Sequence, residues 1–486
     1  MHEQVITHFK NQLQLLAIEK EAEISINKSI ISTSSVNERV KKGFTWYPLE
    51  IKEDGYGFGD KPFLLVERTK NKGGKHRFRS GNPIELFNTK GEELIQGIIH
   101  YINEDEMKLI FHIDDLPNWV NSSSLGINFL VDEKSFIEMG KSVNLLMKTE
   151  DHRKVELVET ILGLRKPYFL NIPNPIEIPH LNDSQNEALN NMIAANDIGI
   201  IHGPPGTGKT TTLVQVIKQL AKGERHILVC TPSNAAADLL TQKLADQKLN
   251  VVRVGSISRV DEELLVHTLD EKLKSSKEYD EIKKIKKQAA EYRKMASKYK
   301  RTFGKSEREQ RNIMYKQAKS LSKDANDYED HLIDKIFDNA DVITCTLVGS
   351  TTRYLANRKF YTVIIDEAAQ ALEAATWIPI SKGQKVILAG DPFQLPPTIK
   401  SKEAAKAGLQ ETLLEQCITK KMKVNLLDTQ YRMNEQIMSF SNQQFYDGKL
   451  KADETVKSHS IDDKPMQFID TAGCGFEEKK DKETLS

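Results

Sequence analysis

Helical and strand-like hydrophobic patterns alternate along the chain and indicate several structural units. Over residues 1–40, apolar residues recur every three or four positions among charged residues, which predicts a long amphipathic helix. Residues 44–140 instead contain short β-rich runs, separated by Gly, Asn and Asp, which predict a small antiparallel barrel. The predicted strands cover residues 63–66, 84–87, 95–102, 109–113 and 127–131.

The second half of the chain has the pattern of a parallel sheet. Residues 141–166 are again helical, and residues 171–179, which hold three prolines, predict a linker. After residue 181, short apolar runs alternate with helical stretches, as expected for strands that are buried on both faces of a sheet. These runs cover residues 198–201, 227–230, 342–345, 362–365 and 386–388. We therefore expect a doubly wound α/β domain after the linker.

A charged segment at residues 261–335 interrupts the α/β pattern. Between residues 281 and 320 it holds 14 Lys and Arg residues but only 4 Asp and Glu residues. One interpretation is a solvated helical hairpin, and the other is a basic arm that contacts the phosphates of a nucleic acid. The sequence leaves both interpretations open.

Composition narrows the class of protein. The 486 residues include 69 Lys and Arg and 69 Asp and Glu, which excludes a uniformly basic, histone-like binder but not local basic patches. The four cysteines lack the spacing of a zinc site, which predicts reduced thiols. The sequence has neither a secretory signal pattern nor a run of 18 apolar residues. We expect a cytoplasmic protein, or a nuclear one in a eukaryote, that has no membrane partner and is most simply a monomer.

The clearest chemical motif is Gly203-Pro-Pro-Gly-Thr-Gly-Lys-Thr210, which follows a predicted strand and precedes a helical pattern. It has the G-x-x-x-x-G-K-[ST] spacing of a phosphate-binding loop, the P-loop. Its glycines let backbone N–H groups turn toward phosphate oxygens, and the helix N-terminus adds a positive dipole. Lys209 can reach the β- and γ-phosphates of ATP, and the Thr210 hydroxyl can bind Mg²⁺. The predicted nucleotide-binding residues here are Gly203, Pro204, Pro205, Gly206, Thr207, Gly208, Lys209, Thr210 and Thr211.

Three later motifs supply the other parts of an ATP-hydrolysing site. The apolar run before Asp366 and Glu367 predicts a strand whose C-terminal end carries two carboxylates, where ligands bind in open α/β sheets. Asp366 is the expected Mg²⁺ ligand, and Glu367 is the expected base for the attacking water. Gln394, after the next strand, is a candidate sensor of the γ-phosphate. Arg432 is a candidate stabiliser of the transferred phosphoryl group, and Tyr431 is a candidate for stacking on a base.

In this order, the motifs resemble those of superfamily 1 helicases, and most closely the Upf-like branch that includes the immunoglobulin-mu-binding helicases. The resemblance rests on Ile201–Thr212, Thr231–Asn234, Asp366–Gln370, Gly390–Pro397 and Gln430–Met433. It extends to the opening helix and to Asp470–Gly475, so it covers essentially the whole chain. It implies ATP-driven 5′→3′ translocation on single-stranded RNA or DNA, with strand separation, and ATP and Mg²⁺ as the cofactors.

The resemblance also implies roles that the local pattern does not explain. Gln185 would read the edge of the adenine base, as in the family's Q motif. The residues that would contact the single strand are Thr231, Pro232, Ser233, Asn234 and Thr346. The basic loop Arg68–Arg79 would either rest on the nucleic acid or form a solvated hairpin tip.

The family pattern implies a division of the chain into domains. Residues 1–43 form a stalk helix, 44–140 a β-barrel domain, and 141–180 a second stalk helix with the linker. Residues 181–260 and 336–422 form the first RecA-like ATPase domain, and 261–335 form a helical insertion in it. Residues 423–486 supply only the start of a second RecA-like domain. We therefore expect a chain that is cut short at its C-terminal side, and that binds ATP but hydrolyses it slowly.

Two other functions stay open at this point. The chain is either a passive module that binds nucleotide or nucleic acid, or a P-loop ATPase of another branch, such as a transporter motor. Against the second stands the lack of a Leu-Ser-Gly-Gly-Gln motif, and Gln394 and Tyr431-Arg432 fit helicases better. The sequence settles neither RNA against DNA nor the identity of any protein partner.

Overall fold

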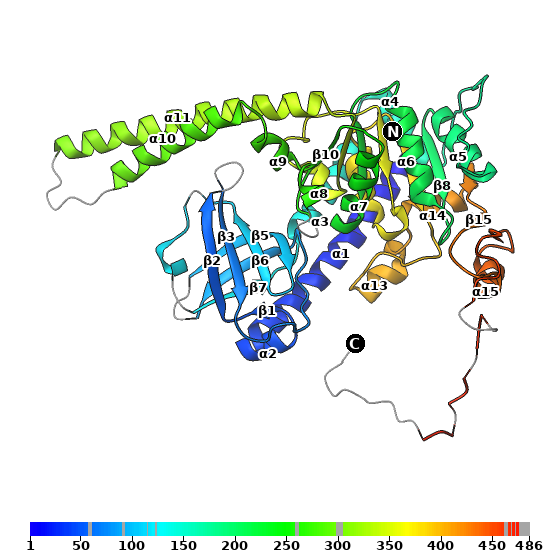
Figure 1. Cartoon of the computed structure of the whole chain (residues 1–486), viewed down its shortest axis with the longest axis horizontal. Coiled ribbons are helices and arrows are strands. Elements are labelled where there is room, and N and C mark those ends of the chain that lie inside the picture. The colour runs from blue at the N-terminus through cyan, green and yellow to red at the C-terminus, as the bar shows by residue number, and fades with distance from the viewer. Residues whose placement is uncertain are drawn as a thin grey trace.

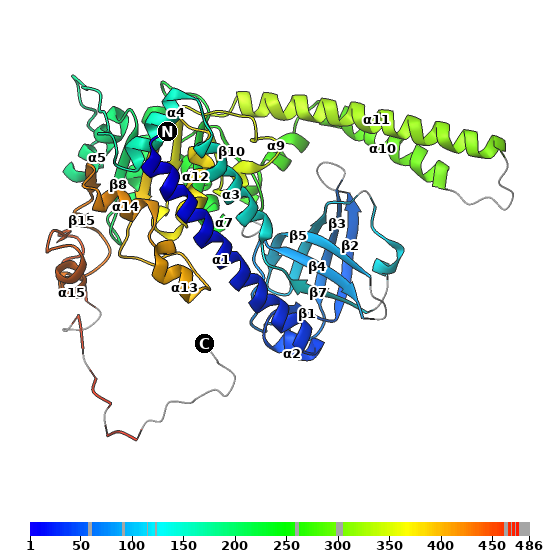
Figure 2. The same cartoon turned by 180° about the vertical axis from the view of Figure 1, so that it is seen from behind.

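The computed structural model describes residues 1–56, 61–89, 93–113, 115–121, 124–257, 262–297, 305–460, 465–467, 469–471 and 473–475. The expectations for the tip of the charged segment and for the last part of the second RecA-like domain lie outside these residues. Figure 1 and Figure 2 show an α/β body, a barrel-like sheet beside it, and a helical hairpin that projects past the barrel. Within the described ranges, no helix is long and apolar enough to cross a membrane.

The amphipathic pattern at the N-terminus folds as two helices rather than one. α1 covers Glu3–Thr33 and α2 covers Val36–Lys41, because Ser35 has an extended backbone and starts a new helix. The Ser35 hydroxyl accepts a hydrogen bond from the Glu38 N–H, and the Glu38 carboxylate accepts one from the Ser35 N–H. This capping box fixes the break between the two helices. α1 runs from the α/β body down to the barrel (Figure 2).

The stalk is held to the body by packing along one face of α1. Val5, Phe9 and Leu16 are buried in the core of the body. The Phe9 ring meets the Trp377 ring edge-on, with 5.3 Å between the ring centroids. α3 (Glu133–Met147) packs beside α1, whereas α4 (His152–Ile161) packs in the body, where Leu157 and Val158 are buried. α1 and α3 therefore connect the barrel to the core of the body.

The barrel-like sheet has seven antiparallel strands in the order β1-β7-β4-β5-β6-β3-β2. They are β1 (Thr45–Trp46), β2 (Leu49–Tyr56), β3 (Pro62–Arg68), β4 (Pro83–Asn88), β5 (Leu94–Asn103), β6 (Glu106–Phe111) and β7 (Leu125–Phe129). Trp46, Leu86 and Leu109 are among the residues of its buried core. The sequence pattern misses β1 and β2, because β1 has two residues and β2 carries mostly exposed charged side chains.

The body is built on a parallel sheet in the order β10-β11-β9-β12-β13-β8-β14. Its strands are β8 (Ile198–His202), β9 (Ile227–Thr231), β10 (Val251–Arg253), β11 (Val342–Thr346), β12 (Thr362–Ile365), β13 (Lys385–Gly390) and β14 (Val424–Leu426). The pattern misses β10 and β14, which have three residues each. β14 follows the expected boundary at residue 422 and yet pairs with β8, so the first sheet extends past that boundary. The predicted fold class, a parallel α/β sheet with an inserted antiparallel barrel, is confirmed.

Successive residues of each central strand are buried on opposite faces of the sheet. Along β9, Leu228 and Cys230 join one core cluster, whereas Ile227 and Val229 join the other. The helices around the sheet are α5 (Asp183–Ala194), α6 (Lys209–Leu220), α7 (Asn234–Asp246), α12 (Glu373–Ile380), α13 (Lys402–Ala404) and α14 (Leu413–Thr419). Burial on both faces of the sheet explains why the strands appear in the sequence as continuous apolar runs.

The four cysteines are free thiols, as predicted, and three of them are buried.

The charged segment folds as helices. They are α8 (Glu262–Leu265), α9 (Leu269–Lys274), α10 (Tyr279–Ser297) and α11 (Lys305–Asp338). α10 and α11 pack on each other along small residues, with Ala289 and Ala325 buried, and project as the hairpin of Figure 1. After the central sheet, the chain forms β15 (Thr429–Gln430), α15 (Glu435–Phe445) and β16 (Lys451–Ala452), which pair or pack outside that sheet. The helical hairpin is common to both interpretations of the segment, and its contact with phosphates stays a prediction.

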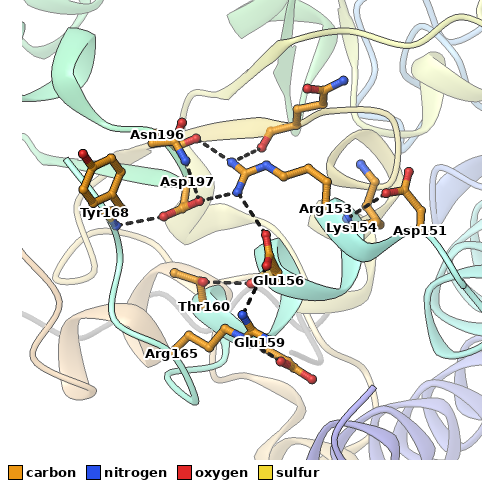
Figure 3. Close-up of polar contacts among 11 residues, drawn as sticks. Asp151, Arg153, Lys154, Glu156, Glu159, Thr160, Arg165, Tyr168, Asn196 and Asp197 are labelled. Carbon is orange, nitrogen blue, oxygen red and sulfur yellow. Dashed lines mark hydrogen bonds and ion pairs between the residues drawn. The ribbon is translucent and has the colours of Figure 1, made fainter. Parts of the chain in front are cut away.

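A network of polar contacts joins α4 to the N-terminal ends of two central strands (Figure 3). Arg153 forms an ion pair with Asp197, directly before β8, at 2.5 Å between Nη1 and Oδ1. Its Nη2 donates to the backbone carbonyls of Asn196, at 2.7 Å, and Gln384, at 2.9 Å. The second oxygen of Asp197 accepts from the Tyr168 N–H at 2.8 Å. The network therefore fixes α4 to the N-terminal ends of the strands, opposite the ends that carry the P-loop.

Asp197→Ala is expected to lower the melting temperature by roughly 5 °C or more. The change removes the carboxylate of a residue that is 6% exposed and leaves the Arg153 guanidinium without its anionic partner. Thermal unfolding followed by fluorescence tests this. The control is Asp334→Ala, because Asp334 pairs with Arg358 at the surface, with its side chain 66% exposed. Equal melting temperatures for the two variants would show that the Asp197 carboxylate adds no more stability than an exposed ion pair.

Candidate active site

The P-loop connects β8 to α6 at the C-terminal edge of the central sheet. Gly206 and Gly208 have φ angles of 81° and 75°, in the left-handed region that favours glycine. A Cβ atom on Gly206 would lie 2.6 Å from the Cβ of Arg432. A Cβ on Gly208 would lie 2.6 Å from Nε2 of Gln185. These glycines therefore allow two other segments to approach the loop closely, in addition to opening its backbone.

Lys209, Asp366 and Glu367 meet at the start of α6. The Lys209 Nζ lies 2.7 Å from Oδ1 of Asp366 and 2.5 Å from Oε1 of Glu367, both just after β12. Burial by itself lowers the pKa of Lys209, but the two carboxylates outweigh it and raise that pKa above its ordinary value. Glu367 has a φ of 55°, and its second oxygen accepts from the Gln370 amide at 3.0 Å. Three of the predicted catalytic residues are thus brought together, with the lysine in its charged form.

The oxygen atoms near this cluster suit a hard divalent cation. Thr210 is half-buried on the first turn of α6, next to Lys209, while Thr211 is exposed. The Thr207 hydroxyl is used inside the loop, where it donates to the Pro204 carbonyl at 2.7 Å. Among the described residues, no group of three or more His, Cys, Asp or Glu side chains could hold a metal ion alone. A cation here would therefore share its ligands with a hydroxyl, water or phosphate, as Mg²⁺ commonly does.

Gln185 lies beside the P-loop, but its side chain is engaged at both ends. Its Oε1 accepts from the Asn182 N–H at 3.0 Å, which completes the capping box of α5. Its Nε2 donates to the Thr207 carbonyl at 3.0 Å, and the residue is 4% exposed. The structure thus places Gln185 as a support of the loop, and its reading of adenine stays a prediction.

Tyr431 and Arg432 belong to the segment that packs against the P-loop. The Tyr431 N–H donates to the Gly206 carbonyl at 2.9 Å, and its hydroxyl accepts from the Asn182 amide at 2.9 Å. The Arg432 N–H donates to Oε1 of Gln430 at 2.8 Å, while the Arg432 side chain is exposed. Tyr431 therefore bridges the loop and the start of α5, next to Gln185.

Gln394 lies in the loop after β13, and β13 is the strand that pairs with β8. It is exposed, and its Nε2 donates to Oδ2 of the buried Asp391 at 2.8 Å. The Gly203 N–H donates to the Gly390 carbonyl at 3.0 Å, which holds this strand end against the P-loop. Nothing in the sequence pattern singles out Asp391 as the carboxylate that holds the candidate sensor.

The residues that the resemblance assigns to the single strand line the ends of β9 and β11. Thr231 and Thr346 are opposite each other in the parallel pairing of these strands. The Thr231 hydroxyl donates to the Ser233 carbonyl at 2.7 Å, and the Ser233 hydroxyl caps α7. Pro232 is half-buried and Ser233 is exposed. Of these residues only Ser233 is exposed, while Thr231 is buried, and the contact of this segment with a nucleic acid stays a prediction.

The Asn234 side chain joins the body to the barrel. Its Nδ2 donates to the Ser80 carbonyl at 3.0 Å, and its Oδ1 accepts from Nη2 of Arg253 at 2.9 Å. The Arg253 side chain is fully buried and pairs with Asp238 at 2.8 Å. A Cβ on Gly81, whose φ is 88°, would lie 3.2 Å from the Asn234 amide. Asn234 is therefore a docking point for the barrel, a role that the sequence does not reveal.

Two basic residues of the loop Arg68–Arg79 serve the barrel itself. Arg68 is 3% exposed, pairs with Asp105 at 2.5 Å and lies over the Trp46 ring at 4.8 Å. The Arg77 guanidinium lies over the Phe44 ring, 4.5 Å from its centroid. Only part of the charge of this loop is therefore directed to solvent.

Comparisons with known proteins identify the family of the chain. A family model described as an AAA domain matches residues 180–402, and a second, also described as an AAA domain, matches residues 409–486. The chain is 32% identical over 501 residues to the DNA-binding protein SMUBP-2 of Rattus norvegicus, covering 98% of the chain and 50% of that protein. It is 30% identical over 537 residues to an uncharacterized ATP-dependent helicase of Methanocaldococcus jannaschii, covering 99% of the chain and 78% of that protein.

A third relative is the ATP-dependent helicase NAM7 of Saccharomyces cerevisiae, 35% identical over 336 residues, with 68% of the chain and 31% of that protein covered. The chain spans about half the length of the SMUBP-2 proteins that it matches. The relatives match the family that the motifs predict, and the family models cover both the P-loop segment and the segment that packs against it. The chain belongs to the superfamily 1 helicases, in their Upf-like branch.

Proposed function

We propose that the chain is an ATPase, stimulated by nucleic acid, that moves 5′→3′ along single-stranded RNA or DNA and separates strands. The observation that carries the proposal is the position of Lys209 between Asp366 and Glu367, at 2.7 and 2.5 Å, where the P-loop meets the end of β12. A passive binding module does not require a carboxylate pair at the P-loop lysine. The printed names of two relatives, as ATP-dependent helicases, support the same proposal.

The proposed chemistry divides between Lys209, Thr210, Asp366 and Glu367. Thr210 and Asp366 would hold Mg²⁺, since a hydroxyl and a carboxylate are ligands that this ion prefers. Mg²⁺ supplies neutralisation of the charge on the phosphates when it is bound. Lys209 stabilises the negative charge of the β- and γ-phosphate oxygens, and Glu367 accepts the proton of the attacking water. The left-handed backbone of Glu367 turns its carboxylate back toward the P-loop lysine.

The other site residues are proposed to frame the nucleotide. Tyr431 stacks on the adenine, because its backbone and hydroxyl are anchored to the P-loop and to the start of α5. Gln185, which lies beside the P-loop, reads the edge of the base. Gln394 senses the γ-phosphate from the next strand end, and Arg432 stabilises the transferred phosphoryl group from the segment that follows the first sheet.

The single strand is proposed to cross the C-terminal ends of β9 and β11. Ser233, which is exposed, and Thr346, which is half-buried, lie along this path, and Pro232 shapes the turn. Thr231 is 1% exposed and supports the turn from below through its hydrogen bond to the Ser233 carbonyl. Asn234 contributes by holding the barrel next to this path through Ser80. Contacts of this kind are made to the backbone of the strand, so they suit both RNA and DNA.

A strand-displacement assay tests the proposal. In the presence of ATP and Mg²⁺, the chain should separate a partial duplex that has a 5′ single-stranded overhang but not one that has a 3′ overhang. Omission of ATP serves as the control for passive melting. Equal separation of both substrates would refute the polarity. If ATP hydrolysis is stimulated while neither duplex is separated, the chain is a nucleic-acid-dependent ATPase, and the strand-separating part of the proposal fails.

A further inference from the structure

A single buried carboxylate collects hydrogen bonds from three parts of the chain. Asp391, which follows β13, is 1% exposed. Its Oδ1 accepts from Nε2 of His202 and from the Phe393 N–H, both at 3.1 Å. Its Oδ2 accepts from Nε2 of Gln394 and from the Tyr446 hydroxyl, both at 2.8 Å. Although burial works to raise it, these hydrogen bonds hold the pKa of Asp391 below its usual value, so the group is charged at neutral pH.

The donors connect the nucleotide site to the segment beyond it. His202 is the last residue of β8, directly before the P-loop, and Gln394 is the candidate γ-phosphate sensor. Tyr446 follows α15 and lies in residues 409–486, which the second AAA model matches. Gln394 and Tyr446 therefore donate hydrogen bonds to the same oxygen atom, Oδ2 of Asp391.

Tyr446 is built into this position rather than resting on a surface. It is 6% exposed, and its ring meets the Phe393 ring edge-on, at 5.4 Å between centroids. Burial, together with the hydrogen bond to Asp391, raises the pKa of Tyr446, so its hydroxyl stays a donor. Behind it, the Tyr446 and Gly448 N–H groups donate to the Asn442 carbonyl, and the Leu450 N–H donates to Oδ1 of Asn442. Hydrogen bonds to Asn442 therefore link Tyr446 to Gly448 and Leu450.

We propose that Asp391 is a positioning residue of the ATPase site that couples Gln394 to Tyr446. The inference rests on the proposed function, because it takes Gln394 as the group that senses the γ-phosphate. When the Gln394 amide turns to the γ-phosphate, Tyr446 is left as the side chain that holds Oδ2, and its bond to Asp391 strengthens. When the phosphate is lost, Gln394 returns to Oδ2 and competes with Tyr446. The segment after α15 is thus held more tightly in the ATP state than afterwards.

Tyr446→Phe tests the coupling, because it removes one hydroxyl and keeps the ring that packs on Phe393. In the presence of a single-stranded oligonucleotide, kcat for ATP should fall roughly tenfold, while KM for ATP stays within about twofold. The control is Tyr168→Phe, since Tyr168 is 60% exposed and far from the site, and it should behave as the wild type. An unchanged kcat, or a parallel loss of kcat and ATP affinity, would overturn the proposal.

A second measurement does not depend on turnover. In the wild-type chain, a non-hydrolysable ATP analogue should slow hydrogen exchange of the Gly448 and Leu450 amides, which Asn442 holds. Tyr446→Phe should abolish this slowing while leaving the melting temperature near that of Tyr168→Phe. Asp391→Asn should also abolish it, and if that variant does not fold, Tyr446→Phe alone decides. Slowing that persists in Tyr446→Phe would overturn the inference. A wild-type chain that shows the slowing but no hydrolysis would instead contradict the proposed function.

Discussion

Lys209→Ala is expected to lower kcat for ATP hydrolysis by at least about 100-fold and to weaken ATP binding. The ammonium group lies 2.7 Å from Asp366 and 2.5 Å from Glu367, directly after the P-loop glycines. Under the proposed function, its removal takes away the charge that stabilises the phosphoryl oxygens. It also leaves two carboxylates close together without the cation between them, which raises the cost of ionising both.

Steady-state hydrolysis and equilibrium binding of a fluorescent ATP analogue measure the two effects. The matched control is Lys222→Ala, because Lys222 is exposed near the other end of α6 and its Nζ contacts only Gln219 among the hydrogen bonds described. This control should keep the wild-type rate and affinity. Hydrolysis by Lys209→Ala within threefold of the wild type would show that the P-loop is not the hydrolytic site.

Glu367→Gln is expected to separate binding from chemistry. A glutamine has the same length and can still accept from Lys209, so ATP affinity should change by no more than a few fold, but it cannot take a proton from water. General-base catalysis typically contributes about 10²–10⁴ in rate, so kcat should fall by a factor in that range. The same two assays measure it, with Glu454→Gln as a control, because that side chain is 86% exposed at the surface.

The outcome of Glu367→Gln distinguishes two roles for the residue. If ATP affinity falls in parallel with the rate, Glu367 serves to hold Lys209 in place, as its contact at 2.5 Å would allow, and another group is the base. If affinity is kept and the rate is lost, the assignment as base stands.

Features that depend on contiguous residues could be predicted from the sequence. The P-loop could be located because its eight residues are consecutive and lie between a strand and a helix pattern. Asp366 and Glu367 could be placed at the sheet edge because a buried strand directly precedes them. The fold class followed from the change between a barrel-like and a parallel-sheet pattern. In each case, the physical signal is local periodicity or the end of a strand.

Features that depend on distant contacts could not be predicted. Asn234 holds Ser80, 154 positions away, and Tyr446 holds Asp391, 55 positions away, and neither contact leaves a periodic signal in the chain. β10 and β14 have three residues each, too few for a strand pattern to stand out. The break between α1 and α2 depends on the single capping box of Ser35 and Glu38, which the long helical periodicity conceals.

The central claim is that the cluster of Lys209, Asp366 and Glu367 hydrolyses ATP under the control of a bound strand. The rate of ATP hydrolysis with and without single-stranded DNA or RNA tests this claim most directly. The proposed function predicts a slow rate for the chain alone and a rise of roughly tenfold or more when an oligonucleotide is added, because coupling energies between sites of a few kcal/mol are typical. Lys209→Ala should show neither the slow hydrolysis of the chain alone nor the rise with an oligonucleotide. Hydrolysis that is the same with and without nucleic acid would contradict the claim and would indicate a P-loop ATPase of another kind.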